Sequence, residues 1–201
     1  MSFTKKLLKC VCSLLVLAVF FGCTLAILNT VLYVSPTERT NRAITKIYGE
    51  LKEYDVYLDV DNPERNDKAQ ECFNPTTQQQ IGVINKIYKI GNDTLFQTTG
   101  FNGYKNGTIT LWIKVTTDNN NRLVIDKIIY ENNTKQTLMS KLDGSFYQNF
   151  LVDVTDNKDF FASAYDEKEK STIINAVSGA TKSAMAACNA VNCVIYYLGV
   201  I

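Results

Sequence analysis

Hydrophobic residues are distributed very unevenly along this chain. Residues 10–34 form one uncharged, largely apolar run, and Lys5, Lys6 and Lys9 come just before it. About 25 apolar or small residues, each with a helical rise of about 1.5 Å, are enough to cross a bilayer core of roughly 30 Å. The pattern predicts a membrane anchor over residues 1–35 that stays in the mature protein.

Two other interpretations of the apolar run remain open. A cleaved signal peptide usually has an apolar region of only about 7–15 residues, and this run is longer. The sequence Phe21-Gly22-Cys23 resembles a lipoprotein cleavage site, which would make Cys23 the lipidated N-terminus. Against this, the apolar run continues to Leu32 and does not end at the cysteine.

The charges that flank the run predict its orientation. Lys5, Lys6 and Lys9 favour a cytoplasmic N-terminus by the positive-inside rule. The protein is therefore expected to cross the cell membrane once, with its C-terminal domain outside the cytoplasm. Arg39 and Arg42, just beyond the span, act against this orientation.

Helical periodicity begins again directly after the span. Within residues 37–54, Ile44, Ile47, Tyr48 and Leu51 recur at helical spacing. They predict an amphipathic juxtamembrane helix.

The middle of the chain is dominated by strand patterns. Residues 55–80 are polar and predict a loop, with one short strand at 56–60. After it, runs of alternating or β-branched residues, separated by turn residues, predict an antiparallel meander. The expected strands are 82–90, 94–99, 108–117 and 122–131.

Two further helices complete the predicted fold. Residues 139–152 place Leu142, Phe146 and Phe150 on one helical face, and the Ala-rich segment from Thr181 to about residue 198 lacks Gly and Pro. The expected fold class is α+β, with one N-terminal transmembrane helix and an antiparallel sheet that packs against a C-terminal helix. The expected organisation is an anchor over 1–35, a juxtamembrane helix and loop over 36–80, and the sheet domain over 81–201.

Composition narrows the chemistry. Basic and acidic residues number 21 and 20, and no basic stripe indicates a nucleic-acid partner. The chain has no histidine, which excludes Ser-His and Cys-His nucleophile pairs and histidine-ligated metals. Of the six cysteines, Cys72 is alone in its region, and Cys188 and Cys193 point in different directions on the last predicted helix. No disulfide framework and no metal site is therefore expected.

The segment 175–184, NAVSGATKSA, places hydroxyls and small residues where the last helix is expected to begin. Ser178 is a candidate N-cap, and Thr181 lies at or near the first helical residue. Free amides and the helix dipole favour an anion such as phosphate at that end. An ordinary capped helix start is the alternative interpretation.

NAVSGATKS resembles the covalent flavin-attachment motif of the FMN-binding domain family. That motif reads Asp, two variable residues, Ser or Thr, Gly, Ala, Thr or Ser, a variable residue, and Ser or Thr. The resemblance implies that FMN is attached by a flavin transferase, through its phosphate, to Thr181. Ser178, Gly179, Ala180 and Ser183 occupy the other motif positions.

The context of the motif also resembles the family, with some departures. A single N-terminal membrane helix and a Gly-aromatic turn at residues 100–104 match it. The family's leading Asp is Asn175 here, and Lys182 stands where an apolar residue is usual. After the second long strand the family often has Glu-Thr-x-Gly, and this chain has Gln-Thr-Leu-Met at residues 136–139.

Several residues are candidates for contact with the flavin ring. Tyr104 and Phe101 have aromatic rings that stack on flat molecules, although both have packing in the sheet as an alternative. Thr137 is a further candidate. Trp112 alternates within a strand and is expected to lie in the core.

The family includes the G subunit of the Rnf ion-translocating electron-transport complex, which this chain resembles most, and the C subunit of the sodium-pumping NADH:quinone reductase. The resemblance implies an electron carrier with covalent FMN and no catalytic residues of its own. Its expected partners are other membrane subunits, a flavin transferase and membrane lipid. Two alternatives are a stand-alone extracytoplasmic flavoprotein and a flavin-free, membrane-tethered interaction domain.

Overall fold

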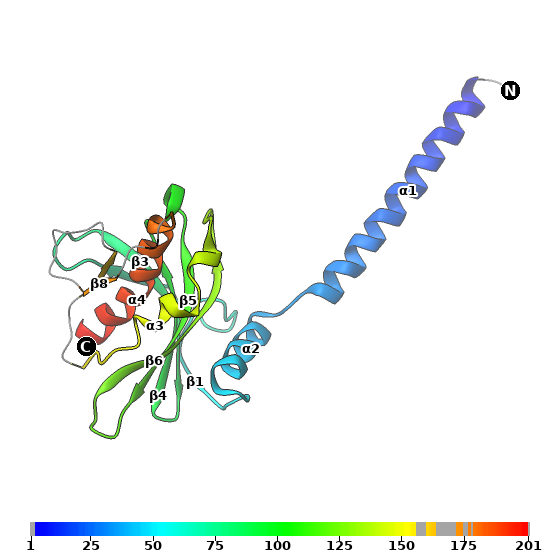
Figure 1. The fold of residues 1–201 in the computed structure, drawn as a ribbon. Coiled ribbons are helices and arrows are strands. Elements are labelled where there is room, and N and C mark those ends of the chain that lie inside the picture. Colours follow the sequence, from blue (N-terminus) through cyan, green and yellow to red (C-terminus); the bar gives the residue numbers. More distant parts are fainter. Residues whose placement is uncertain (1–2, 156–159, 164–171, 175–176, 178, 201) are drawn as a thin grey trace. The chain divides into compact units, whose positions relative to one another are not determined.

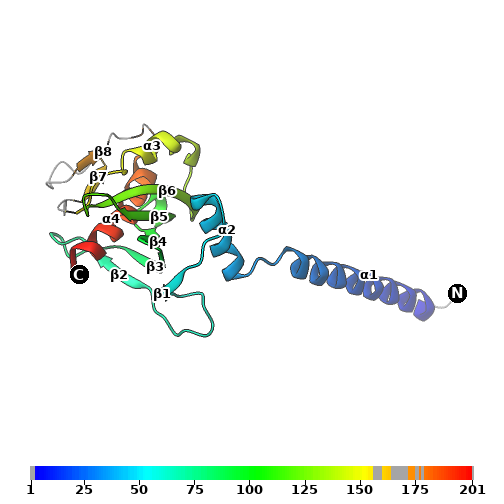
Figure 2. The same ribbon diagram turned by 90° about the horizontal axis from the view of Figure 1, so that it is seen from below.

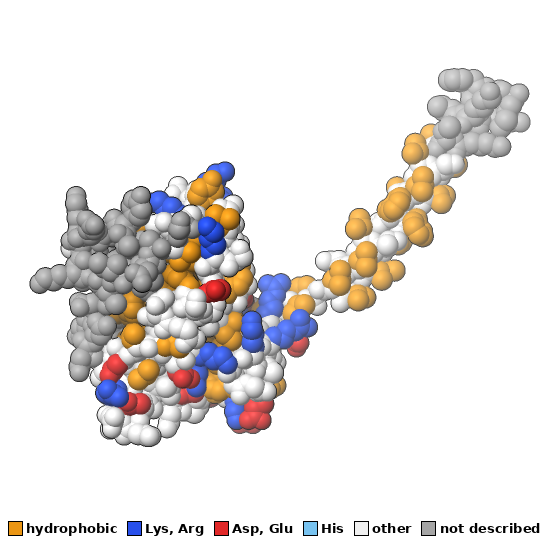
Figure 3. All heavy atoms as spheres, in the orientation of Figure 1, with side chains coloured by type: hydrophobic (Ala, Val, Ile, Leu, Met, Phe, Trp, Pro, Cys, Tyr) orange, Lys and Arg blue, Asp and Glu red, His pale blue; other side chains and the backbone are white. Residues whose placement is uncertain are grey.

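The first helix follows the apolar run. In the computed structural model, which describes residues 3–155, 160–163, 172–174, 177 and 179–200, helix α1 spans Phe3–Leu32. Its segment Val11–Leu32 is the one stretch of the described chain that is long and apolar enough to cross a membrane. The chain divides into two compact units, Met1–Arg39 and Thr40–Ile201. Hydrophobic side chains line the visible face of α1 from Val11 onward, whereas acidic and basic side chains are interspersed over the visible face of the second unit (Figure 3).

The second unit is built on an antiparallel sheet (Figure 1). Its strand order is β1-β3-β4-β5-β6, and β2 pairs with β3 as well. The strands are β1 Asp55–Asp59, β2 Gln70–Phe73, β3 Gln80–Ile90, β4 Asp93–Gly100, β5 Ile109–Thr117 and β6 Leu123–Asn133. The expected α+β class, antiparallel sheet and C-terminal helix are thus confirmed.

Helices cover both faces of this sheet (Figure 2). Along β5, Leu111 and Ile113 belong to the hydrophobic core shared with α4, which spans Thr181–Val200. Trp112 between them points to the other face, where it packs with Ile44 and Ile47 of α2, Pro36–Tyr48. The alternation with a period of two therefore gives the sheet two apolar faces. Trp112 is buried, as predicted.

Helix α4 approaches the sheet very closely because small residues meet at the contact. A Cβ atom on Gly100 would lie 2.0 Å from the carbonyl oxygen of Ala186 and 2.3 Å from the amide nitrogen of Ala190. Only glycine fits at the end of β4 with α4 in this position. The alanines of α4 are thus explained by packing.

Two of the predicted helices are shorter than expected. Helix α2 ends at Tyr48 because Gly49 adopts the left-handed conformation, φ 83°, that commonly terminates helices, and Leu51 is exposed. The helix expected over residues 139–152 is reduced to α3, Gly144–Gln148, which starts where the Asp143 side chain accepts hydrogen bonds from the amides of Ser145 and Phe146.

The apolar residues of that second segment are nevertheless placed as expected. Leu142, Phe146 and Phe150 are all buried in the main core. Elements that the pattern did not predict are strand β2 and the parallel pair β7, Phe161–Ser163, and β8, Thr172–Ile174.

Candidate functional site

The Gly-aromatic turn between β4 and β5 is tightly closed. The amide of Gly103 donates to the carbonyl of Gly107 at 2.9 Å, and the 3-10 turn Tyr104–Asn106 lies between them. Both glycines are buried, and a Cβ atom on either would lie within 2.5 Å of the Gln136 side-chain nitrogen. These glycines let the turn pack directly on Gln136. Tyr104 is left 39% exposed at the tip.

Gln136 joins three segments that lie far apart in the sequence. Its Oε1 accepts from the amide of Tyr104 at 3.0 Å and from the hydroxyl of Ser183 in α4 at 2.8 Å. Its Nε2 donates to the carbonyl of Thr134 at 2.9 Å. The turn, the segment after β6 and the first turn of α4 are therefore fixed to one another at this amide.

The start of α4 coincides with the motif. Thr181 is its first residue and is half-buried, and Gly179 before it has a φ of 79°, a conformation that favours glycine. The amide of Ala184 donates to the carbonyl of Ala180 at 2.8 Å, so regular helical bonding begins here. Thr181 thus occupies a helix N-terminus, as the sequence predicted.

Cationic and apolar side chains adjoin this helix start. A Cβ atom on Gly179 would lie 3.0 Å from Nζ of Lys141 and 3.7 Å from Cδ1 of Leu138. Leu138 is 48% exposed, and its backbone is left-handed with a φ of 62°. Lys182, in the first turn of α4, is exposed. Positive charge and exposed apolar surface therefore meet at Gly179, two residues before Thr181.

The other predicted site residues have different surroundings. Ser183 is buried, and its hydroxyl contacts Gln136 and, at 3.4 Å, the carbonyl of Thr137. On its buried side, Ser183 therefore links the first turn of α4 to Gln136. Ala180 is also buried, whereas the Thr137 side chain is exposed. Ser178 lies outside the described residues, as does Asn175.

Phe101 is held at the base of the turn. It is half-buried, and its carbonyl accepts from the Asn189 side chain of α4 at 3.0 Å. The Phe101 backbone therefore joins the turn to α4, and Tyr104 is the more exposed of the two aromatic candidates.

Sequence reasoning missed three residues of this site. Gln136 was noted only as a departure from the family pattern, and Lys141 and Leu138 were not considered. The available signal was the Gly-rich turn, since buried glycines indicate close approach of another group. The identity of that group depends on tertiary structure.

This arrangement fits an esterified flavin phosphate. A helix N-terminus and the ammonium groups of Lys141 and Lys182 favour an anion. Exposed Tyr104 and Leu138 offer aromatic and aliphatic surface of the kind that a flat ring covers. The described residues include no cluster of Cys, Asp and Glu that could hold a metal ion.

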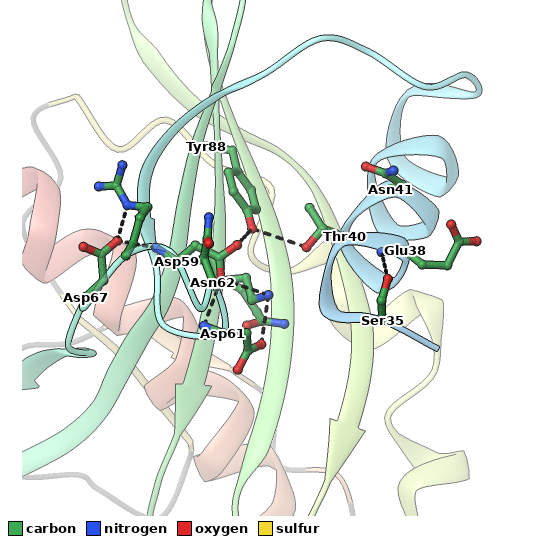
Figure 4. Close-up of polar contacts among 12 residues, drawn as sticks. Ser35, Glu38, Thr40, Asn41, Asp59, Asp61, Asn62, Asp67 and Tyr88 are labelled. Carbon is green, nitrogen blue, oxygen red and sulfur yellow. Dashed lines mark hydrogen bonds and ion pairs between the residues drawn. The ribbon is translucent and has the colours of Figure 1, made fainter. Parts of the chain in front are cut away.

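A second polar cluster lies on the opposite face of the sheet, toward α2 (Figure 4). Lys86 is buried, and its ammonium lies 3.2 Å from Asp59 and 2.9 Å from Asp61. The hydroxyl of Tyr88 donates to Asp59 and lies 3.3 Å from the hydroxyl of Thr40 in α2. Burial, and then the bond to Asp59, raise the pKa of Tyr88. The buried ammonium of Lys86 has two carboxylate partners within the cluster, which points to a structural role.

No protein-family model and no curated protein sequence matches this chain.

Proposed function

We propose that this protein is a membrane-anchored electron-transfer subunit that carries FMN as a phosphate ester of Thr181. The observation that carries the proposal is the position of Thr181, at a helix N-terminus that Gln136 joins to the Gly-aromatic turn. The ester would form with loss of the hydroxyl proton of Thr181 and of the leaving group of the transferase's flavin substrate.

Bound FMN would supply the redox chemistry, accepting and passing on electrons. The protein would supply position and charge. Lys141 and Lys182 would offset the phosphate charge together with the helix dipole. Tyr104 and Leu138 would cover part of the ring, and Ser183 would hold Gln136 beneath them.

The proposed setting is an Rnf-type ferredoxin:NAD⁺ oxidoreductase coupled to ion translocation. The apolar helix α1 would anchor the chain once in the cell membrane, with the sheet unit outside the cytoplasm. Electrons would reach the flavin from other membrane subunits, so the chain alone would be a redox subunit and not a complete enzyme.

Two other functions are compatible with the same fold, and particular residues favour one of them. A stand-alone extracytoplasmic flavoprotein would use the same site with other partners. A flavin-free, membrane-tethered interaction domain is favoured by Asn175 and by Gln136, which replace acidic residues of the family pattern.

Flavin reduction in host membranes tests the proposal. Membranes that contain the wild-type chain should show flavin bleaching when reduced ferredoxin is added. In membranes with Thr181→Val, the flavin that migrates with this chain on a denaturing gel should be absent. Bleaching by ferredoxin only when the partner subunits are present supports the complex. A protein-bound flavin that ferredoxin never reduces would support the stand-alone carrier, and absence of flavin the interaction domain.

A further inference from the structure

Two cysteines that are far apart in the sequence meet inside the second unit. Strand β2 places Cys72 opposite Gly82 of β3, and α4 crosses the same place. A Cβ atom on Gly82 would lie only 2.7 Å from Sγ of Cys193. Because Gly82 has no side chain, the Cys193 sulfur occupies that space, beside the cross-strand neighbour Cys72.

The contacts of the two thiols are direct. Sγ of Cys72 donates to the carbonyl oxygen of Cys193 at 3.8 Å, and the Cys72 thiol adds to the burial that raises the pKa of Cys193. Both residues are fully buried and carry free thiols. Cys188 is also buried on α4, but it lies about 140° away around the helix axis.

We propose that Cys72 and Cys193 form a disulfide in the mature protein, linking β2 to the C-terminal half of α4. Two S–H bonds break and one S–S bond forms. The two electrons and two protons pass to the disulfide of an extracytoplasmic thiol–disulfide oxidoreductase, whose S–S bond breaks to give a dithiol. Disulfides form and persist in that compartment.

Burial determines when the bond can form. It raises the pKa of the Cys193 thiol, and the thiolate is the species that attacks a disulfide. Full burial also excludes a partner enzyme. The bond therefore forms during folding, before α4 has completed its packing on β2 and β3.

This inference rests on the outward orientation in the proposed function and not on the flavin. The sequence predicts no disulfide framework, and the contact with Cys193 gives Cys72 a buried neighbour that its isolated place in the sequence does not indicate. The bond would close a loop of 121 residues, which restricts the unfolded chain.

The test is a thiol map of the full chain isolated from its own host. Cells are quenched in acid, the protein is alkylated under denaturing conditions without reductant, and tryptic peptides are analysed by mass. We expect peptide 69–86, with Cys72, joined to peptide 183–201 with loss of two hydrogens. Cys188, in the same peptide as Cys193, should be alkylated and serves as the internal control. Reduction should lower the thermal midpoint by several degrees.

Alkylation of both Cys72 and Cys193 in the quenched protein would overturn the proposal, as would a bond to Cys188. Protease added to intact host cells distinguishes a wrong cysteine pairing from a wrong membrane orientation. If the unit is digested and the thiols are free, the pairing is wrong. If the unit is protected, the orientation fails as well. A linked pair beside an unmodified Thr181 would leave the disulfide intact and overturn the flavin.

Discussion

At the scale of single residues, the candidate site depends on one neutral amide. Gln136 accepts two hydrogen bonds with one oxygen, from the Tyr104 amide and the Ser183 hydroxyl, and donates with its nitrogen to the Thr134 carbonyl. A carboxylate at this position would keep the acceptor and lose the donor. The two roles of Gln136 can therefore be separated by substitution.

We predict that Gln136→Ala lowers the free energy of unfolding by about 1–3 kcal/mol, because the Tyr104 amide and the buried Ser183 hydroxyl lose their acceptor. Flavin content should fall as the start of α4 loosens. Gln136→Glu is the matched control and should keep more of both. Equal flavin content in all three proteins would show that Gln136 does not position Thr181. Unfolding by urea in detergent, followed through Trp112, the only tryptophan, and flavin fluorescence on gels measure the two effects.

At the scale of elements, α4 is held at a distance that only small residues permit. The end of β4 meets α4 at Gly100, where a side chain would overlap Ala186 and Ala190. The site lies at the N-terminal end of the same helix, so its geometry depends on this packing.

Gly100→Ala should therefore destabilise the protein by about 1–3 kcal/mol or more, because the added methyl group pushes α4 away from the sheet. Gly144→Ala is the control, since its Cβ atom would have no neighbour within 4 Å. It should change stability by less than about 1 kcal/mol. Urea midpoints of the two variants check this, and similar values would contradict the close packing.

The buried ammonium of Lys86 leads to a second prediction about contacts between elements. Asp59→Ala should cost about 3–5 kcal/mol, since it removes the less exposed partner of a buried ammonium and the acceptor of Tyr88. Asp61→Ala should cost less than about 1 kcal/mol, because the Asp61 side chain is 52% exposed against 13% for Asp59. Urea unfolding of both variants makes the comparison. Equal losses would mean that burial does not set the strength of these pairs.

Most elements could be predicted from the sequence, including the short strand β1, whereas strands β2, β7 and β8 could not. Strands β3 to β6 have clear strand patterns, and α4 follows from an Ala-rich segment that lacks Gly and Pro. Strand β2 has four residues, which is too short for a reliable pattern, and it forms because β3 offers an edge. The helix expected over 139–152 failed because Asp143 starts a new helix inside it. The local motif indicates Thr181 as a candidate. The contacts of Gln136 and the contact between Cys72 and Cys193 join segments far apart in the sequence, so they depend on tertiary structure.

At the scale of the whole molecule, we propose that the apolar helix α1 anchors the chain and that the sheet unit carries the redox cofactor. Val11–Leu32 is exposed on all sides in the isolated chain, as a lipid-facing helix would be. The sheet unit has its own core on both faces of the sheet.

We predict that the mature protein keeps its N-terminal segment and stays in the membrane pellet after alkaline carbonate extraction. Arginine at both Leu17 and Leu25 should release a large fraction into the supernatant, since each charge near the bilayer centre costs about 2.5–3.5 kcal/mol on the insertion scale. Mass analysis of the N-terminal peptide is the second readout. A mature chain that begins at Cys23 or beyond the span would contradict the anchor.

The phosphate ester on Thr181 underlies the whole proposed function, and an intact-mass measurement of the chain from its own host tests it. We predict a mass increase equal to FMN less one water, located by peptide mapping at Thr181 and absent from Thr181→Val. Ser183→Ala should still carry the adduct on Thr181, at lower occupancy, because the Ser183 hydroxyl is buried against Gln136 and supports the helix start without accepting the flavin itself. An unmodified Thr181, in cells that demonstrably flavinylate another protein, would contradict the account and leave the segment as an ordinary helix start.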